Sequence, residues 1–383
     1  MEYGNAGYGQ GYGYAGYEAP RVETEGTIEI NEILDKARKL GCSDLHFTVG
    51  LVPIVRLNGV LRKMGEYPVM NDQEIMHIAE QMINEEQKAQ VMKCIDTDFS
   101  FTTKRGYRHR CNIFHQSQHT AIAIRLLRND IPTLDDLMLP PILAEFSMRP
   151  RGLVLVTGPT GSGKSTTLAG MIDYINVNKS SHIITIEDPI EYVHEHKRCM
   201  INQREVGQDV GDFALALRAA LREDPDVILV GEMRDLETVT AAITAAETGQ
   251  LVLSTLHTTS AADTINRIID VYPEHQQRQI RTQLASTLVG IIAQTLLPRA
   301  DGTGRLAALE VLNVTDAVSA MIREEKVHQI PSTIQTGKQY GMMCLDYELA
   351  RLARAGIVTE VEALDRCHDK SEFYRYFNAN DRD

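Results

Sequence analysis

The sequence predicts an α/β protein in which a domain built on a parallel sheet follows a smaller α+β domain. The length of 383 residues suffices for about two domains, each with its own core. From residue 151 on, short apolar runs alternate with amphipathic helical patterns, an order typical of a parallel sheet with helices on both faces. A glycine-rich stretch directly after the first of these runs matches a phosphate-binding loop.

Composition and charge are those of a soluble globular protein. Apolar residues make up 43% of the chain and charged residues 24%, both ordinary fractions. The formal net charge of −13 argues against a broad nucleic-acid-binding surface, so no nucleic acid partner is expected. The six cysteines form no C-x-x-C pair, which favours reduced thiols in a cytoplasmic protein. No secretory signal is visible, and the most apolar segment is too short to span a membrane, so we expect membrane association only through partners.

Both ends of the chain are expected to be tails. Residues 1–26 are predicted to be disordered, because the repeated Gly and Tyr of positions 1–20 cannot form a core. A self-association or docking role for this tail is the alternative. Residues 371–383 are expected to be a second tail, although the aromatic run at 373–377 is typical of a helix that docks on its own domain.

Residues 27–128 have the pattern of the small α+β domain. One helical face ends at Gly41, and Asn71 can cap a second helix. Between them, Asn58-Gly59 separates two apolar runs and predicts a hairpin. Further strands are expected at residues 99–101, 107–114 and 120–127. The prolines within residues 129–150 indicate a linker between the two domains.

Residues 151–370 are predicted to form the parallel-sheet domain together with C-terminal helices. Strands are expected at residues 153–156, 183–186, 227–230 and 251–254. A helix at residues 236–247 would have Asp235 as its N-cap and Gly249 as its stop. Other helices are expected at residues 212–223, 274–297, 315–325, 345–355 and 359–367, so that helices would dominate the domain after Pro273.

The glycine-rich stretch follows the first predicted strand and has the spacing of a phosphate-binding loop. The residues expected to bind the nucleotide are Gly158, Pro159, Thr160, Gly161, Ser162, Gly163, Lys164, Ser165 and Thr166. The glycines let successive backbone N–H groups turn toward phosphate oxygens, and Lys164 can reach the β- and γ-phosphates. The Ser165 hydroxyl can ligate Mg²⁺, and a helix that starts at Ser165 adds its positive dipole end. ATP and Mg²⁺ are therefore the predicted cofactors; a glycine-rich turn without chemical function is the alternative.

Polar clusters follow the other predicted strands, at the edge where open parallel sheets bind ligands. Glu187 and Asp188 follow the second strand and could support Mg²⁺, partly through water. Glu191 stands nearby, Glu232 follows the third strand, and His257 follows the fourth. Hydrolysis needs a carboxylate that orients the attacking water, and either Glu191 or Glu232 can supply it. Ordinary loop acids are the alternative reading of these clusters.

Three further segments resemble motifs of the motor ATPases of type IV pili and type II secretion. Residues 185–194, Thr-Ile-Glu-Asp-Pro-Ile-Glu-Tyr-Val-His, resemble their Asp box. Residues 216–235 resemble their Walker B region, and residues 247–258 resemble their His box. Together with the phosphate-binding loop, these motifs occur in register, and the resemblance covers nearly the whole chain beyond the N-terminal tail.

Within that superfamily, residues 328–337 are similar to the retraction ATPases of the PilT family, as is the short N-terminal region. The resemblance implies a homohexameric ring, each chain with a PAS-like domain followed by a RecA-like domain and with ATP bound between subunits. It implies ATP hydrolysis that depolymerises pilin and so drives pilus retraction and twitching motility. The implied partners are an inner-membrane pilus platform protein and a paralogous retraction ATPase, with the protein at the cytoplasmic face of the membrane.

Four arginines match positions that contact phosphate in this family. They are Arg110 and Arg125 in the first domain, and Arg218 and Arg222 before the Walker B strand. Arginine suits that role because its fixed charge and planar fork stabilise phosphoryl oxygens during transfer. A surface ion pair is the alternative for each of them.

Two departures from the family pattern leave other functions open. Gln250 stands where the His box usually has its first histidine, so His257 is the histidine that remains. In the helix at residues 317–324, Ser319 and Ala320 replace an Arg-Asn pair that is linked to retraction. A pilus or type II secretion assembly ATPase, and a weakly hydrolysing accessory subunit of the retraction motor, are therefore alternatives. The net charge disfavours a nucleic-acid translocase.

Overall fold

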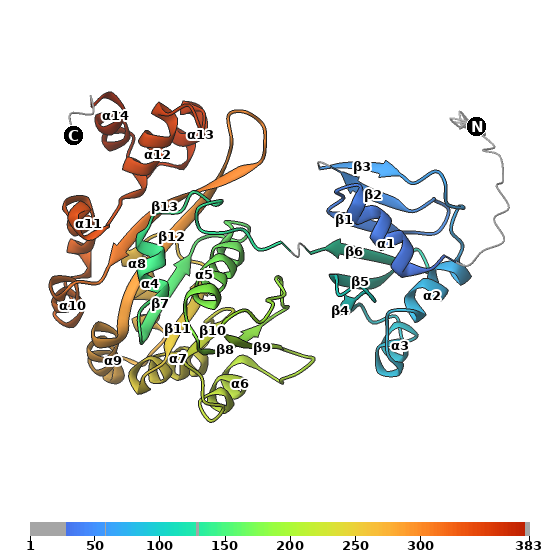
Figure 1. Ribbon diagram of the computed structural model, residues 1–383, viewed down its shortest axis with the longest axis horizontal. Coiled ribbons are helices and arrows are strands. Elements are labelled where there is room, and N and C mark those ends of the chain that lie inside the picture. Colours follow the sequence, from blue (N-terminus) through green and yellow to red (C-terminus); the bar gives the residue numbers. More distant parts are fainter. Residues whose placement is uncertain (1–27, 58, 128–129, 380–383) are drawn as a thin grey trace, which may run out of the picture. The chain divides into compact units, whose positions relative to one another are not determined.

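The chain folds into two compact units that meet in sequence at residues 127 and 128. The computed structural model describes residues 28–57, 59–127 and 130–379 (Figure 1). The predicted disordered tail at residues 1–26 lies outside the described residues. Within the described part of the chain, no helix combines the length and the apolar character that a membrane span requires.

The first unit contains an antiparallel six-stranded sheet in the order β3-β2-β1-β6-β5-β4. Its described elements are α1 (Ile30–Lys39), β1 (Asp44–Phe47), β2 (Ile54–Leu57), β3 (Val60–Lys63), α2 (Asp72–Glu80), α3 (Glu85–Val91), β4 (Thr97–Thr102), β5 (Arg108–Gln116) and β6 (His119–Leu126).

The helices of the first unit cover one face of this sheet. The apolar faces of α1 and α2 pack with inward residues such as Ile122 and Ile124 of β6. As predicted, Asn71 caps α2: its side chain accepts a hydrogen bond from the Glu74 amide at 3.0 Å. The Glu74 carboxylate in turn accepts one from the Asn71 amide at 2.7 Å. Arg125 alternates with Ile124 and is exposed on the other face.

The second unit contains a seven-stranded sheet in the order β13-β12-β7-β11-β10-β8-β9. Every neighbouring pair is parallel except β12 and β13, which are antiparallel. Its described elements are α4 (Ile142–Ser147), β7 (Gly152–Thr157), α5 (Lys164–Asn178), β8 (His182–Glu187), β9 (Met200–Glu205), α6 (Phe213–Ala220), β10 (Val227–Val230), α7 (Leu236–Thr248), β11 (Leu251–Leu256), α8 (Ala261–Asp270), α9 (Glu274–Thr287), β12 (Leu288–Pro298), β13 (Arg305–Asn313), α10 (Asp316–Arg323), η1 (Val327–Gln329), α11 (Ile330–Thr336), η2 (Lys338–Tyr340), α12 (Leu345–Arg354), α13 (Glu360–Arg366) and α14 (Lys370–Asn378).

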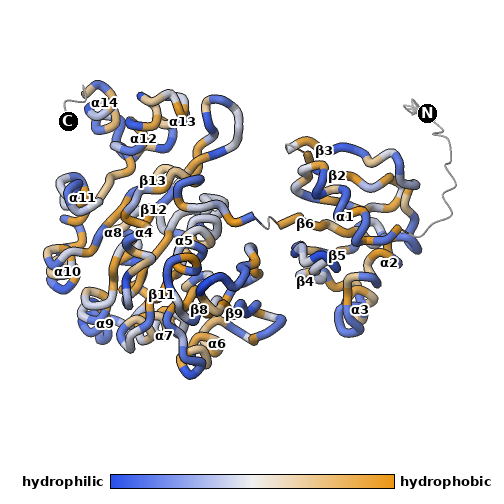
Figure 2. The backbone as a smooth tube through the Cα atoms, in the orientation of Figure 1, coloured by the Kyte–Doolittle hydropathy of each residue, from blue (hydrophilic) through white to orange (hydrophobic). Residues whose placement is uncertain are grey.

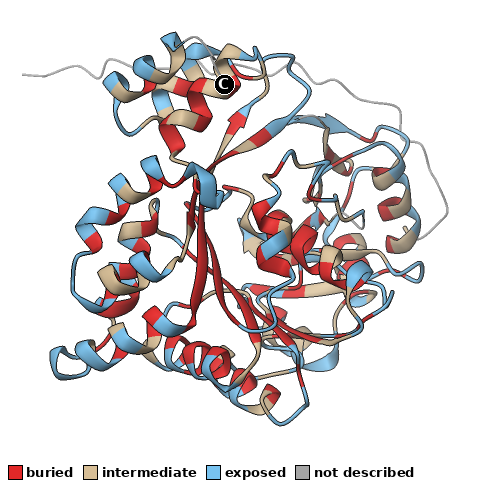
Figure 3. Ribbon diagram, turned by 60° about the vertical axis from the view of Figure 1, so that its left-hand side comes forward, coloured by how far each residue is buried: buried red, intermediate tan, exposed pale blue. Residues whose placement is uncertain are grey.

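Helices cover both faces of the second sheet, as the sequence predicted. On one side, Leu153 and Leu155 of β7 pack with residues of α6 to α11. On the other, Val154 and Val156 of the same strand pack with α4 and α5. The central strands are therefore buried along their length (Figure 3) and mostly hydrophobic (Figure 2). This sandwich fixes where the carboxyl ends of the strands lie.

The prediction of a helix over residues 274–297 is wrong in its second half. Helix α9 ends at Thr287, and the chain continues directly as strand β12, which pairs with β7 and β13. Nearly all residues of β12 are buried, because the strand is covered on both faces. Such a run has no period of two, so its pattern does not distinguish a buried strand from a buried helix. Strand β13 was missed for the same reason.

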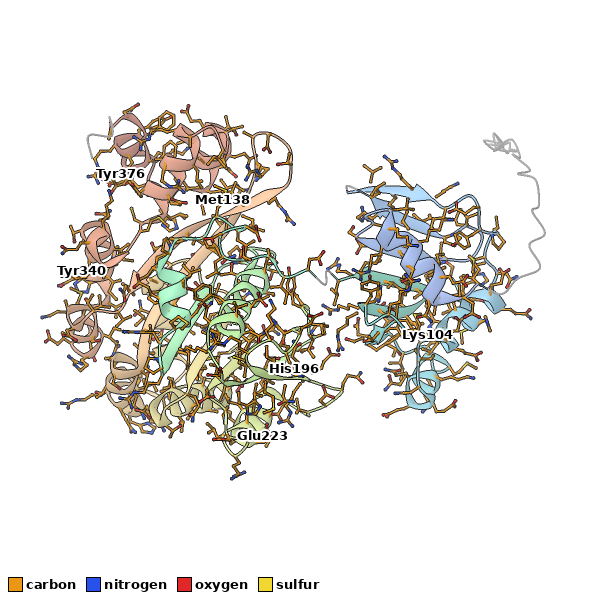
Figure 4. The ribbon with its side chains drawn as sticks, viewed as in Figure 1. Lys104, Met138, His196, Glu223, Tyr340 and Tyr376 are labelled. Atoms are coloured by element: carbon orange, nitrogen blue, oxygen red, sulfur yellow. The ribbon has the colours of Figure 1, made fainter. Side chains whose placement is uncertain are left out.

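The segment at residues 129–150, expected to be a linker, belongs to the second unit from residue 130 on. It contains α4, whose Ile142, Leu143 and Phe146 are buried in the core beside β7. The prolines start and end this short helix rather than mark an open connection. The expected C-terminal tail is also structured, because α14 buries Phe373 and carries Tyr376 (labelled in Figure 4). The Tyr376 ring packs edge-on against the Tyr347 ring.

Replacing Gly290 with alanine should destabilise the second unit. A Cβ at this position of β12 would lie 2.5 Å from the Phe146 ring of α4. Relieving that overlap requires a core side chain or the strand to shift, a cost of about 1–3 kcal/mol. Gly211→Ala is the matched control, because a Cβ there meets no atom within 4 Å. Thermal melting should show a lowered midpoint for the first variant alone; equal midpoints would contradict this packing.

Candidate active site

The candidate site is a cleft of about 290 Å³ at the carboxyl ends of four adjacent strands of the second unit. The strands β7, β11, β10 and β8 are neighbours and parallel, so the segments that follow them converge at one edge of the sheet. The predicted site residues that line the cleft are Thr160, Gly161, Lys164, Ser165, Glu187, Asp188, Glu191, Glu232 and His257.

The phosphate-binding loop joins β7 to α5 and needs its glycines. Gly158, Gly161 and Gly163 have φ values of 142°, 80° and 90°, in a region that other L-residues rarely adopt. A Cβ on Gly158 would also lie 2.3 Å from the Gln294 carbonyl oxygen. Helix α5 begins at Lys164, one residue earlier than predicted, and no side chain caps it. Its first N–H groups are thus available to an anion.

Lys164 lies folded back over the loop. Its Nζ donates to the Gly158 carbonyl at 2.9 Å and to the Pro159 carbonyl at 3.1 Å. Burial lowers the pKa of this ammonium, while the charges of Glu232 and Glu191 act in the opposite direction. The ammonium is therefore held at the loop by acceptors that a phosphate can replace.

Glu187 is a carboxyl group in a shielded position at the end of β8. Its Oε1 accepts hydrogen bonds from Thr185 Oγ1 at 2.6 Å and Gln203 Nε2 at 3.1 Å. Burial raises its pKa to about 7, against the lowering effect of these two donors. Asp188, the next residue, is exposed at the cleft. With the Ser165 hydroxyl, these groups form a set of hard oxygen donors at one wall, which fits Mg²⁺.

Substituting Glu187 with glutamine should stabilise the protein at alkaline pH. The native carboxyl keeps its proton up to pH 7, whereas the unfolded one, with its ordinary pKa of 4.5, loses it earlier. Stability from this group is therefore lost as pH rises from 4.5 to 7, by about 3 kcal/mol in full. Gln keeps both acceptor contacts without a charge.

Calorimetry of the nucleotide-free protein in EDTA measures the effect of Glu187→Gln. The melting temperature of the second unit should rise by about 6–12 °C at pH 8. At pH 4, below both pKa values, the carboxyl is largely protonated in the folded and the unfolded chain, and the two proteins should melt together. An equal shift at both pH values would show that ionisation of Glu187 is not the cause.

Glu232 lies between two basic side chains. Arg234 Nε is 2.8 Å from its Oε1, and His257 Nε2 is 3.4 Å from its Oε2. The preceding Gly231 is packed closely, since a Cβ there would lie 3.3 Å from the Ile186 carbonyl oxygen. An acid in place of Gly231 would therefore require the Ile186 carbonyl at the end of β8 to shift by a few tenths of an ångström.

Two neighbours of the predicted residues were missed from the sequence. Arg234 was not assigned a role, although it follows Glu232 by two positions in the Walker B segment. Tyr192 was also passed over, although it follows Glu191; its hydroxyl lies 2.9 Å from Thr166 Oγ1. That contact connects the Asp-box segment to the first turn of α5. Both residues lie within two positions of an acid in a recognised motif, and this proximity in sequence could have indicated a role for them.

Arg218 and Arg222, the two predicted arginines of the second unit, do not line its cleft. Arg218, on α6, forms an exposed ion pair with Glu237 at 2.9 Å, and Arg222 is exposed beyond the end of α6. Arg110 and Arg125 are register partners on β5 and β6 of the first unit, and both are exposed. Their contact with phosphate stays a prediction that requires a second chain.

The two departures from the family pattern both lie away from the cleft. Gln250 immediately precedes β11, whereas His257 follows it, so the strand separates them by roughly 20 Å. The Gln250 carbonyl accepts a hydrogen bond from the Gly152 amide at the start of β7, so Gln250 lies at the amino ends of the parallel strands, away from the cleft. Residues 317–324 form α10 and its C-cap, and the helix packs on α9 through Val318 and Ile322. Neither departure alters the cleft of this chain.

A family model described as "Type II/IV secretion system protein" matches residues 23–343, most of the chain. The chain belongs to this family. It is 45% identical over 346 residues to the "Type IV pilus retractation ATPase PilT" of Pseudomonas aeruginosa, covering 90% of this chain and all of that protein. It is also 38% identical to the "Type IV pilus ATPase PilU" of that organism, with 88% of each chain covered.

Among solved structures, the crystal structure described as "Pilus Retraction Motor PilT and Bound ADP" is similar to this chain. The TM-score is 0.85 and the identity 47%, covering 91% of this chain and 99% of the other. This likeness confirms the predicted fold class, a RecA-like parallel-sheet ATPase domain after a small PAS-like α+β domain. The likeness covers both units, so it agrees with the resemblance seen in the motifs.

Proposed function

We propose that this chain is an ATP-hydrolysing motor that drives the retraction of type IV pili. The observation that carries the proposal is the cleft itself, where the phosphate-binding loop meets carboxylates from β8 and β10 and a histidine from β11. Similarity to PilT over nine-tenths of the chain supports retraction as the task that this hydrolysis performs.

Nucleotide phosphates would bind on the N–H groups of residues 158–166, with Lys164 exchanging its two carbonyl contacts for the β- and γ-phosphates. Ser165, Glu187 and Asp188 would hold Mg²⁺, partly through water, and the ion would neutralise phosphate charge. Half-protonated Glu187 can give up its proton when a cation arrives. In this way the loop supplies binding and the acids supply the metal site.

Glu232 is the better candidate for the carboxylate that orients the attacking water. Its side chain is 19% exposed, and Arg234 and His257 hold it from two sides. Glu191 is exposed at the rim of the same cleft. A carboxylate that orients a water must itself be held in place. Glu232, which is held by two side chains, meets this requirement better than the exposed Glu191. His257 and Arg234 would then position Glu232.

The exposed arginines support a site that is completed by a neighbouring chain in a homohexamer. Arg218 and Arg222 lie on the second unit outside its cleft, and Arg110 and Arg125 are exposed on the first unit. Arg218 pairs with Glu237 and Arg125 with Asp44, but these are exposed ion pairs of low energy that a phosphate can replace. Movement between subunits would follow nucleotide turnover at each interface. The ring would act at the inner face of the cell membrane on the pilus platform protein, with a PilU-like paralogue as a second motor partner.

Deleting the gene in its host and counting surface pili tests the proposal. Retraction predicts many pili with no twitching motility, restored by the wild-type gene. Absence of pili would instead identify an assembly ATPase. A steady-state ATPase assay on the purified chain addresses the accessory-subunit alternative, which predicts nucleotide binding with little turnover.

A further inference from the structure

The side chain of Gln294, on β12, contacts the phosphate-binding loop from behind. Its Nε2 donates to the Ser162 carbonyl at 2.6 Å, and its Oε1 accepts from Thr167 Oγ1 at 2.9 Å. The residue is only 3% exposed. One amide therefore joins the tip of the loop to the first turn of α5, from a strand more than 120 positions away in the sequence.

The orientation of this amide follows from its partners. A main-chain carbonyl can only accept, so the NH₂ group must face Ser162, and the hydroxyl of Thr167 then donates to the remaining oxygen. Rotating the amide by 180° would set two acceptors against each other. The pair of contacts thus has one satisfied arrangement.

Close packing reinforces the same contact. Strand β12 pairs with β7 up to Ala293 and Thr157, which places Gln294 beside the first glycine of the loop. A Cβ on Gly158 would lie 2.3 Å from the Gln294 carbonyl oxygen, and one on Gly163 would lie 3.1 Å from its Nε2. Two glycines of the loop therefore lie directly against this one residue.

We propose that Gln294 is a positioning residue for nucleotide binding, which holds the phosphate-binding loop in its anion-ready shape through the Ser162 carbonyl. A loop with several glycines has many conformations to lose when it binds phosphate. A fixed contact behind the loop reduces that loss before the nucleotide arrives. The inference rests on one part of the proposed function, namely that the loop binds nucleotide.

The test uses the full chain and measures the Kd of fluorescently labelled ADP with Mg²⁺. Gln294→Met keeps the length of the side chain without its donor, and the Kd should rise about tenfold. Thr167→Val removes the other contact and leaves the Ser162 bond, so its effect should be smaller, about threefold or less. In turnover assays Gln294→Met should raise KM with kcat little changed, because the lost contact is made before and during the reaction alike.

Gln294→Glu separates positioning from simple packing. At pH 8 its carboxylate faces the Ser162 carbonyl and cannot donate, so the Kd should exceed that of the wild type. At pH 5.5 a protonated carboxyl can donate a hydrogen bond to the Ser162 carbonyl again. The Kd of Gln294→Glu divided by that of the wild type should therefore be smaller at pH 5.5 than at pH 8. This readout also decides the question if Gln294→Met does not fold.

Asn176→Leu is the control for loss of a buried amide. Asn176 Nδ2 donates to the Glu195 carbonyl at 2.7 Å, and its Oδ1 accepts from the amides of Lys197 and Cys199, outside the cleft. This variant should lose thermal stability with its Kd within twofold of the wild type. Unchanged Kd values in both Gln294 variants, or equal losses in Asn176→Leu, would overturn the proposal. Since binding is measured without turnover, a chain that binds ADP but does not retract pili would refute the proposed function alone.

Discussion

Replacing Lys164 with alanine should reduce ATP turnover at least ~100-fold while the chain keeps its fold. The ammonium lies where the loop meets the cleft, and it donates hydrogen bonds to the Gly158 and Pro159 carbonyls. Neutral carbonyls bind an ammonium less strongly than phosphate oxygens do, because the phosphate oxygens are negatively charged. Shielding of the site from water strengthens that attraction. Removing the side chain takes a positive charge from the transferring phosphoryl group and leaves the core untouched.

Lys179→Ala is the matched control for this variant. Lys179 Nζ also donates to two main-chain carbonyls, of Ser147 at 3.2 Å and Arg149 at 2.9 Å, and burial lowers its pKa as well. It lies at the opposite end of α5 and does not line the cleft. Phosphate release should fall only in Lys164→Ala, with both variants monitored by thermal melting. Undiminished turnover in Lys164→Ala would refute the assignment of the site.

The loop and the acids of the cleft could be predicted from sequence because local rules determine them. Short apolar runs between turn residues indicate strands in an alternating α/β order. Strands connected in this way run parallel, so the loops that follow them lie together at the carboxyl ends of the strands. Glu187 and Glu232 are 45 residues apart, yet both line the cleft as that rule requires.

Strands β12 and β13 could not be predicted in the same way. A strand buried on both faces shows no alternation, and Leu288 to Leu297 is apolar enough to suit a helix equally well. The pairing of β12 with β7 decides the matter, and that is a tertiary contact. The helix predicted over residues 274–297 includes Gln294 as one of its polar residues, so the sequence does not predict the contact of Gln294 with the loop.

Protonation and subunit contacts are the other features that local patterns do not show. The raised pKa of Glu187 comes from burial beneath neighbouring segments, which a run of three acids in five residues does not reveal. The proposed contact of Arg110 and Arg125 with phosphate would need a second chain. Both side chains are exposed, and Arg125 forms the surface ion pair with Asp44 that is the alternative to phosphate contact, at 3.2 Å.

Glu232→Gln should lower kcat about 100- to 1,000-fold and leave ATP binding intact or stronger. Glutamine keeps the size of the side chain, and its one carbonyl oxygen can still accept from Arg234 while its NH₂ group faces the His257 ring nitrogen. It is a far poorer acceptor for the proton of an attacking water, so the chemical step slows. Its neutrality also removes a negative charge near the polyphosphate, which should tighten rather than weaken binding. Single-turnover phosphate release and labelled-ATP binding measure the two effects separately.

Glu191→Gln decides between the two candidate carboxylates. Both carboxylates act on the charge of Lys164, so both substitutions alter the electrostatics of the cleft in the same direction. Only the carboxylate that orients the water should also control the chemical step. Because Glu232 is held by Arg234 at 2.8 Å and by His257 at 3.4 Å while Glu191 is exposed, the large loss is expected in Glu232→Gln alone. The reverse result, with Glu232→Gln above a tenth of wild-type activity, would transfer the role to Glu191 and leave Glu232 as support for the metal.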